Sequence, residues 1–362
     1  MSKYIIFGKT VEINFDENKF KKLKDELSLY PVSNKNADVI INIVKNLNIP
    51  DDYIQNPKTH YTFKNGFLAN YGPQIMYIKD NNLLKIFLGE PSQVSFIKRL
   101  SNMEFASIEE QIGQILHELV LVPMNYFFND RFLIHSSAFK SPDGKTFLIG
   151  GTGGIGKTSL ELYLCREKKF KFIADDILIM DKTGNVFPNL AFPKIYGYNV
   201  KGKRNIKKVL LSERSLFNKI HWNLSMKFRG ESKVRRKISP LKLYDSYLDS
   251  GTNANDYFVL VRDKNVKKLA KEPISVQLAT EVTLKVIQNE YSIFHQHIIW
   301  HEYNALLKNL NPIISLNEIY SNWKSLSHQA FKNLNLYIVR VPEKYDHQEF
   351  LKDFYFQIIK TK

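Results

Sequence analysis

The chain reads TFLIGGTGGIGKTSLELYLCREKKFKFIADD from Thr146 to Asp176. The short apolar run Thr146–Ile149 predicts a strand, a glycine-rich loop follows it, and Lys157–Glu167 predicts a helix. A second apolar run, Phe170–Ala174, predicts another strand that leads into the pair Asp175-Asp176. This order of strand, glycine loop, helix and strand is typical of an α/β core that binds nucleotides.

The glycine-rich loop matches the pattern G-x-x-x-x-G-K-[ST] at every fixed position. Glycines let backbone N–H groups approach phosphate oxygens, and the following helix adds its positive N-terminal end. Lys157 supplies a mobile cation for catalysis, and the Thr158 hydroxyl can reach Mg²⁺. We therefore predict that this loop binds ATP with Mg²⁺. The predicted contacts are Gly151, Thr152, Gly153, Gly154, Ile155, Gly156, Lys157, Thr158 and Ser159.

Three further side chains complete a candidate catalytic group. Asp175 and Asp176 come at the end of a predicted strand, where one carboxylate can hold Mg²⁺ and the other can accept a proton from an attacking hydroxyl. His135 lies on the predicted strand Phe132–Ala138, which a hairpin returns beside the glycine loop. The alternatives are an aspartate pair in a surface turn and a histidine with a structural role.

These elements together resemble the HPr kinase/phosphorylase family, whose catalytic domain is related in fold to phosphoenolpyruvate carboxykinase. Family members carry a strand with a histidine before a small residue, a loop of the type G-x-S-G-x-G-K-S, and then V-A-D-D. Here Ile134–Ala138, Gly151–Thr158 and Phe172–Asp176 match in order, over about a fifth of the chain. The resemblance implies a P-loop kinase core in a divergent member of the family.

The resemblance also implies roles for individual residues. Asp175 would be the general base, Asp176 and Thr158 the magnesium ligands, and His135 a helper near the transferred phosphate. Two features depart from the family: a threonine, Thr158, stands where serine is usual, and the downstream glycine-rich signature is missing. HPr itself is therefore not the expected acceptor.

Two functions from different classes follow. The first is an ATP-dependent kinase that transfers the γ-phosphoryl group to a serine-type hydroxyl of a peptide, protein or small molecule. The alternative is a nucleotide-switched ATPase or regulator that acts on an anionic partner such as nucleic acid. The Asp175-Asp176 pair with His135 favours the kinase, because a switch needs a water-positioning group and a partner-sensing element instead.

The net charge of +16 is concentrated in one part of the chain. Between Lys194 and Lys237, fourteen basic residues stand against two acidic ones. Within this basic insertion Arg229, Arg235 and Arg236 are candidates for contacts with the phosphoryl group or with an acidic acceptor. A solvated lysine-rich face is the alternative. No helix-turn-helix, zinc-finger or RNP-type pattern accompanies the charge, so nucleic acid is not the expected partner.

Other patterns limit the function further. The single cysteine, Cys165, excludes a disulfide framework and a cysteine-rich zinc site. His295, His297 and His301 form a cluster in which an i,i+4 pair can face a metal, although packing is the simpler interpretation. No apolar run suits a secretory signal or a membrane span, so we expect a cytoplasmic protein without a membrane partner. Oligomer formation is left open.

The predicted fold class is α/β, or α+β for the chain as a whole. Residues 1–128 form a mixed, β-rich module with hairpins at Asn65-Gly66, a type I′ turn, and at Asp80–Asn82. Ser107 and Glu110 form a capping box for a helix that Pro123 ends or kinks. Residues 129–362 form the catalytic domain with the basic insertion 194–237. Late strands are expected at Tyr257–Val261 and Leu336–Val341, and helices at Ser275–Asn289 and Leu316–Phe331.

Overall fold

A computed structural model describes residues 2–360 as a mixed α/β protein with mixed sheets. The chain divides into two compact units, each made of three segments. The first unit comprises Met1–Val94, Ser107–Phe132 and Ile287–Leu326, and the second comprises Ser95–Ala106, Leu133–Val286 and Ser327–Lys362. The sequence suggests a single boundary after residue 128. The structure instead assigns α10 (Ser292–Leu307) and much of α11 (Leu316–Phe331) to the first unit.

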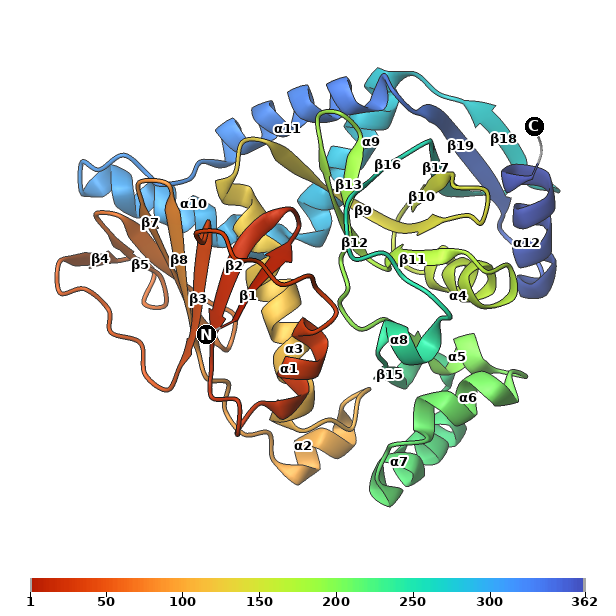
Figure 1. Cartoon of the computed structure of the whole chain (residues 1–362), viewed down its shortest axis with the longest axis horizontal. Helices are drawn as coiled ribbons and strands as arrows, with labels where there is room; N and C mark the ends of the chain where they lie inside the picture. The colour runs from red at the N-terminus through yellow and green to blue at the C-terminus, as the bar shows by residue number, and fades with distance from the viewer. Residues whose placement is uncertain (1, 361–362) are drawn as a thin grey trace. The chain divides into compact units, whose positions relative to one another are not determined.

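The first unit is built around an eight-stranded mixed sheet in the order β1-β2-β3-β8-β7-β6-β5-β4 (Figure 1). The pairs β2–β3 and β3–β8 are parallel, and the other neighbours are antiparallel. Alternate residues of β3 are buried, as expected where one face of a strand meets the core. The strands are β1 (Ser2–Ile6), β2 (Lys9–Asn14), β3 (Val39–Val44), β4 (Tyr53–Gln55), β5 (Tyr61–Phe63), β6 (Gly66–Asn70), β7 (Gln74–Asp80) and β8 (Leu83–Gly89).

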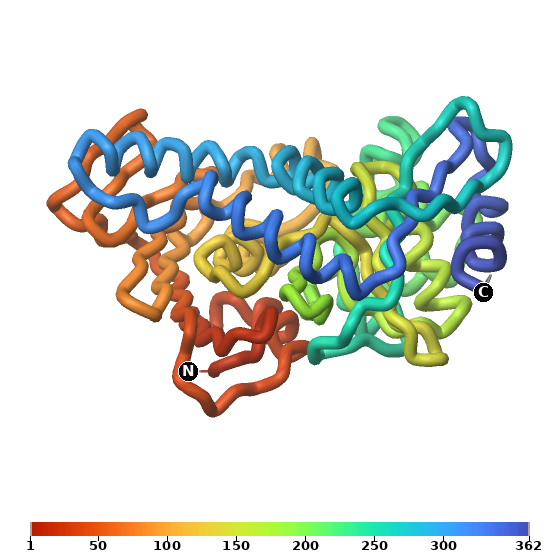
Figure 2. Tube along the Cα trace, turned by 90° about the horizontal axis from the view of Figure 1, so that it is seen from above, coloured from red at the N-terminus to blue at the C-terminus, as the bar shows by residue number. Residues whose placement is uncertain are grey.

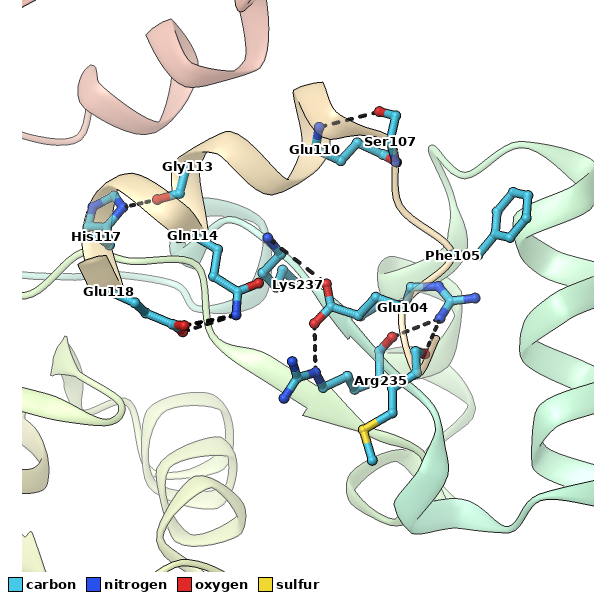
Figure 3. Close-up of polar contacts among 12 residues, drawn as sticks. Glu104, Phe105, Ser107, Glu110, Gly113, Gln114, His117, Glu118, Arg235 and Lys237 are labelled. Carbon is cyan, nitrogen blue, oxygen red and sulfur yellow. Dashed lines mark hydrogen bonds and ion pairs between the residues drawn. The ribbon is translucent and has the colours of Figure 1, made fainter. Parts of the chain in front are cut away.

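The helices of this unit pack through specific contacts. Figure 2 shows α10 and α11 side by side, and the hydroxyl of Tyr320 on α11 lies 3.0 Å from Nδ1 of His295 on α10. The predicted capping box of α3 (Ile108–Leu116) is present (Figure 3), since the Ser107 N–H donates to Glu110 at 2.9 Å and the Glu110 N–H donates to the Ser107 hydroxyl. The remaining helical segments are α1 (Lys21–Leu27), the π-helical turn His117–Leu121 and the 3-10 turn Pro123–Phe127.

Both predicted hairpins form, but the turn of the first differs from the prediction. β7 and β8 pair across Asn81-Asn82, and Asn81 adopts a φ of 52°. β5 and β6 pair Phe63 with Gly66, so the predicted type I′ turn at Asn65-Gly66 is wrong. Gly66 is a strand residue without a positive φ. A Cβ there would lie 2.2 Å from the Tyr77 carbonyl oxygen and 2.5 Å from the Phe63 ring, so close packing requires the glycine.

The second unit contains a nine-stranded mixed sheet in the order β16-β13-β12-β9-β10-β17-β19-β18, with β11 also paired to β9. β10 is parallel to β17 and antiparallel to β9, and β17 is parallel to β19. The strands are β9 (Arg131–Lys140), β10 (Thr146–Gly150), β11 (Lys171–Ala174), β12 (Ile177–Asp181), β13 (Asn185–Phe187), β16 (Thr252–Asn253), β17 (Asp256–Asp263), β18 (Ala270–Pro273) and β19 (Asn335–Pro342).

The basic segment 194–237 folds between two strands that pair with each other, β14 (Lys194–Tyr196) and β15 (Arg235–Lys237). Between them lie α5 (Gly197–Val200), α6 (Arg204–Leu211), α7 (Leu216–Phe228) and a 3-10 turn. The other helices of this unit are α2 (Phe96–Ser101), α4 (Lys157–Glu167), α8 (Pro240–Leu243), α12 (His347–Asp353) and the π-helical Phe354–Ile359. α9 (Val276–Glu290) begins in this unit and ends in the first. Among the helices of residues 2–360, none combines the length and the apolar character needed to cross a bilayer.

Packing at Gly66 gives a test of the first sheet. We expect Gly66→Ala to lower the free energy of unfolding by about 1–3 kcal/mol, because the new Cβ overlaps a backbone carbonyl of the neighbouring strand. Gly89→Ala is the matched control, because a Cβ at Gly89 would lie 3.3 Å from its nearest atom, the Gln74 carbonyl oxygen. Urea unfolding followed by circular dichroism measures both variants. Equal stability of Gly66→Ala and the parent would contradict the strand position of Gly66.

Candidate functional site

The glycine-rich loop connects β10 to α4 and depends on glycine conformations. Gly151, Gly154 and Gly156 have φ values of 133°, 76° and 110°, which residues with a side chain rarely adopt. Gly156 is the N-cap of α4, and a Cβ there would lie 3.0 Å from the ring of Phe350. The loop conformation therefore depends on glycine at these three positions.

Gly153 has a different reason to be glycine. Its φ is not positive, and a Cβ built there meets no atom of the chain within 4 Å. Neither the backbone nor packing within the protein therefore requires a glycine. A ligand that approaches the loop backbone closely would require it, as a bound phosphate does. The loop backbone is thus open to a ligand at Gly153.

Lys157 lies folded over this loop rather than in solvent. Its side chain is buried, and Nζ donates hydrogen bonds to the carbonyl oxygens of Gly151, at 3.0 Å, and Thr152, at 3.1 Å. The ammonium group is held next to the N-terminus of α4, where the helix end also favours negative charge.

The Thr158 hydroxyl is tied to the first of the paired aspartates. It donates a hydrogen bond of 2.9 Å to Oδ1 of Asp175, and the Ser137 hydroxyl donates to the Asp175 carbonyl oxygen at 2.5 Å. Burial raises the pKa of the half-buried Asp175 carboxyl above its usual value. The Asp175 carboxylate is therefore held against the first turn of α4.

A buried acid that the sequence interpretation missed lies next to Asp175. Glu161 on α4 is 0% exposed and accepts a hydrogen bond from the Tyr244 hydroxyl. Burial, followed by the negative charge of Asp175, raises the pKa of Glu161 well above its usual range. Glu161 follows Thr158 by three positions, so the helical repeat places it on the same face of α4.

The second aspartate points to another neighbour. Oδ1 of Asp176 lies 3.3 Å from Nε2 of His135, and the Asp176 side chain is 55% exposed. The Ser136 N–H donates to the Asp176 carbonyl oxygen at 3.0 Å, which fixes this segment against β9. Burial lowers the pKa of His135 to about 4, while Asp176 acts to raise it and Lys157 and Lys194 act to lower it. His135 is therefore neutral at neutral pH.

Two cations near the loop were also missed. Lys194, at the start of β14, is near enough for its charge to lower the pKa of Asp175. Arg262, at the end of β17, donates to the Gly154 carbonyl oxygen at 3.4 Å. Topology was the signal for Arg262, because the carboxyl ends of parallel strands meet at one edge and β17 is parallel to β10.

Two of the residues predicted to contact the nucleotide, Ser159 and Ile155, have side chains that are buried within the unit. Ser159 is 2% exposed, and its hydroxyl accepts a hydrogen bond of 2.8 Å from Nδ2 of Asn199 on α5. The Ile155 side chain is buried in the core of the unit. Ser159 therefore joins α4 to α5, and only the backbone of Ile155 remains for a ligand.

The three arginines predicted to contact the phosphoryl group or the acceptor instead form hydrogen bonds within the second unit. Arg236 is 2% exposed, and its guanidinium donates to both the backbone and the side chain of Asn218. Arg235 donates to Glu104 at 2.6 Å, as Figure 3 shows, and Arg229 donates to the Ser101 carbonyl oxygen at 2.8 Å. The burial and pairing of Arg236 do not fit a contact with a substrate, which corrects the sequence-based assignment.

The histidine cluster belongs to the first unit and is structural. His297 hydrogen-bonds through Nδ1 to Nε2 of His60 at 2.6 Å, whereas Nδ1 of His301 lies 3.1 Å from the Thr62 hydroxyl. The i,i+4 pair thus uses separate partners, His60 just before β5 and Thr62 on β5. Within residues 2–360, no group of three or more His, Cys, Asp or Glu side chains is arranged to hold a metal ion.

Compared with known proteins, the chain matches no protein-family model and no curated sequence.

The buried histidines give a pH dependence of stability. Burial lowers the pKa values of His297 and His301 to about 4, below roughly 6.5 in an unfolded chain. The unfolded state therefore binds more protons between these values, and the free energy of unfolding should fall as the pH decreases from about 6.5 towards 4.

Urea unfolding at several pH values measures this effect. We expect His301→Gln to reduce the loss by on the order of 1 kcal/mol per pH unit within that window, relative to the parent. His328→Gln, at an exposed histidine on α11, is the control. A parent protein equally stable at pH 7 and pH 5 would contradict the structural role of these histidines.

Proposed function

We propose that the chain is an ATP-dependent kinase that transfers the γ-phosphoryl group to a hydroxyl of a peptide, protein or small molecule. The observation that carries the proposal is the 2.9 Å hydrogen bond from Thr158 to Asp175. In P-loop enzymes Mg²⁺ is held by the loop threonine or serine and by an aspartate at the end of a nearby strand. The same pair, next to His135 and Asp176, supports a core of the HPr kinase and phosphoenolpyruvate carboxykinase type.

The charges around the loop suit a triphosphate. The N-terminus of α4 and the loop N–H groups favour anionic oxygens, and the Lys157 ammonium lies beside them. Arg262 contacts the loop carbonyl of Gly154, and Lys194 acts on the carboxylate side. Cations on two sides of the loop can balance the negative charge that spreads over the transferred phosphoryl group.

The geometry supports a division of roles opposite to the sequence-based one. Asp175 shares the Thr158 hydroxyl and is the half-buried member, so we assign it, with Thr158, to Mg²⁺. Asp176 is exposed and paired with His135, so we assign it to the acceptor hydroxyl as the proton-accepting group. Bound Mg²⁺ would supply positive charge to the phosphates. His135, neutral at neutral pH, would hold the Asp176 carboxylate in position.

Nucleotide binding is tested by Lys157→Ala. We expect the dissociation constant for Mg-ATP to rise by about 10- to 100-fold, because charge-assisted hydrogen bonds to phosphate are lost. Lys145→Ala, at an exposed lysine in the turn before β10, is the matched control and should bind like the parent. Isothermal titration calorimetry measures all three proteins. Unchanged affinity in a folded Lys157→Ala protein would refute the proposed phosphate site.

The division of roles is tested by comparing Asp175→Asn with Asp176→Asn. Asp176→Asn should bind Mg-ATP like the parent and lose about 10² to 10⁴ in turnover, the usual contribution of a positioned base. Asp175→Asn should shift the Mg²⁺ titration to higher concentration. The readout is transfer from γ-labelled ATP to water and to a panel of serine-containing peptides.

The reverse pattern would restore the sequence-based roles. If both variants hydrolyse ATP at the parent rate and no peptide is labelled by any of the proteins, the kinase proposal is wrong. ATP hydrolysis without any acceptor would instead favour the nucleotide-switched ATPase.

A further inference from the structure

A stripe of large apolar side chains lies exposed along α7 in the second unit. Leu216, Ile220, Leu224 and Phe228 recur at every fourth position, and their exposed fractions range from 43% to 73%. This spacing places them on one face of the helix. The opposite face is buried through Asn218, Trp222 and Ser225. The face of α7 that points to solvent is therefore apolar, whereas the packed face carries polar and aromatic side chains.

The neighbouring helix α2 extends this apolar surface. Its residues Phe96, Ile97 and Leu100 are 51%, 79% and 44% exposed. The ring of Phe96 packs edge to face on Phe217 of α7 with centroids 6.2 Å apart. Further along, Nε2 of His221 lies 3.1 Å from the Leu100 carbonyl oxygen. The two helices thus form one surface, here called the α2–α7 surface.

A basic row borders this surface. Lys219, Asn223 and Lys227 recur at every fourth position of α7, directly beside the apolar stripe. Lys207 of α6 donates to Oδ1 of Asn223 at 3.3 Å, which brings a third lysine to the same edge. A further exposed lysine, Lys98, lies on α2. The surface therefore combines an apolar floor with a positively charged rim.

The dimensions and the charge select among possible occupants. From Leu216 to Phe228 the stripe rises by about 18 Å, at 1.5 Å per residue, which is the length of a short helix. Two copies of this chain would bring the same lysines together, so charge opposes self-association. An apolar stripe of this length with a basic row beside it corresponds to the footprint of a partner helix.

We propose that the α2–α7 surface binds an acidic, amphipathic helical segment of a partner protein or peptide. The apolar face of this segment would cover the stripe at Ile220, Leu224 and Phe228. Its carboxylates would meet Lys219 and Lys227. Large apolar patches with a polar rim are typical of protein interaction sites. The surface does not include the residues assigned to the nucleotide, so the proposal is independent of the kinase activity.

A designed peptide tests the proposal on the full-length chain. The probe is a fluorescein-labelled peptide of about 18 residues with leucine on one helical face and glutamate on the other, used at roughly micromolar concentration. A peptide of the same composition with scrambled order is its control. Fluorescence anisotropy should show saturable binding of the amphipathic probe, weaker at higher salt, and no comparable binding of the scrambled one.

Substitutions in the surface should weaken this binding. We expect Leu224→Ser and Phe228→Ser each to raise the dissociation constant at least about tenfold, and Lys227→Glu to raise it several-fold. Leu306→Ser, at a leucine on α10 that is 75% exposed, is the matched control and should bind like the parent. Circular dichroism checks that each variant is folded.

Three results would overturn the proposal. The first is equal binding of the amphipathic and scrambled peptides, or unchanged binding by both serine variants. The second is binding to phosphatidylglycerol vesicles that Leu224→Ser abolishes, without any binding of the peptide, which would make the surface a lipid contact. The third is a dimer in sedimentation that Leu224→Ser dissociates, which would make the occupant a second copy of the chain.

Discussion

The pairing of β9 with β10 on one side and with β11 on the other is the constraint on which the candidate site depends. Its register sets Ser136 opposite Gly150, at the start of the glycine loop, and Ala138 opposite Ala174, just before the aspartates. His135 is therefore beside both elements, although it lies far from each in sequence. The hydrogen bonds from Ser136 and Ser137 to the carbonyls of the aspartate pair continue this pairing past the end of β11.

Burial then makes the two adjacent carboxyl groups chemically different. Asp175 faces α4, where Thr158 donates to it and the buried Glu161 lies nearby. Asp176 faces solvent and His135. Successive residues of an extended chain point in opposite directions, so the sequence predicted that the two aspartates would differ. It did not show which of them faces the helix, because that depends on the register between β11 and β9.

Local patterns predicted the elements better than the connections between them. The helix Lys157–Glu167 and the capping box at Ser107 agree with the structure because glycine, serine and helical periodicity act over a few residues. The prediction of a turn at Asn65-Gly66 was wrong because Gly66 is required by close packing against the Tyr77 carbonyl of a neighbouring strand. No local sequence pattern reveals this contact. Arg262 and Lys194 were missed for the same reason, since the parallel pairing of β10 with β17 brings Arg262 to the loop and the charge of Lys194 acts on Asp175 from a later segment of the chain.

In the basic segment 194–237, the number of charged residues does not show which of them are accessible to a partner. Arg236 is enclosed by Asn218 and by the ring of Trp222, where a guanidinium stabilises the fold through directed hydrogen bonds. The half-buried Lys219 and the exposed Lys227, in contrast, lie on α7 beside exposed apolar residues. An anionic partner can make direct contact only with the second group, because the guanidinium of Arg236 is buried and its N–H groups already donate within the fold. The arginines thus hold the segment together, and the lysines determine what it attracts.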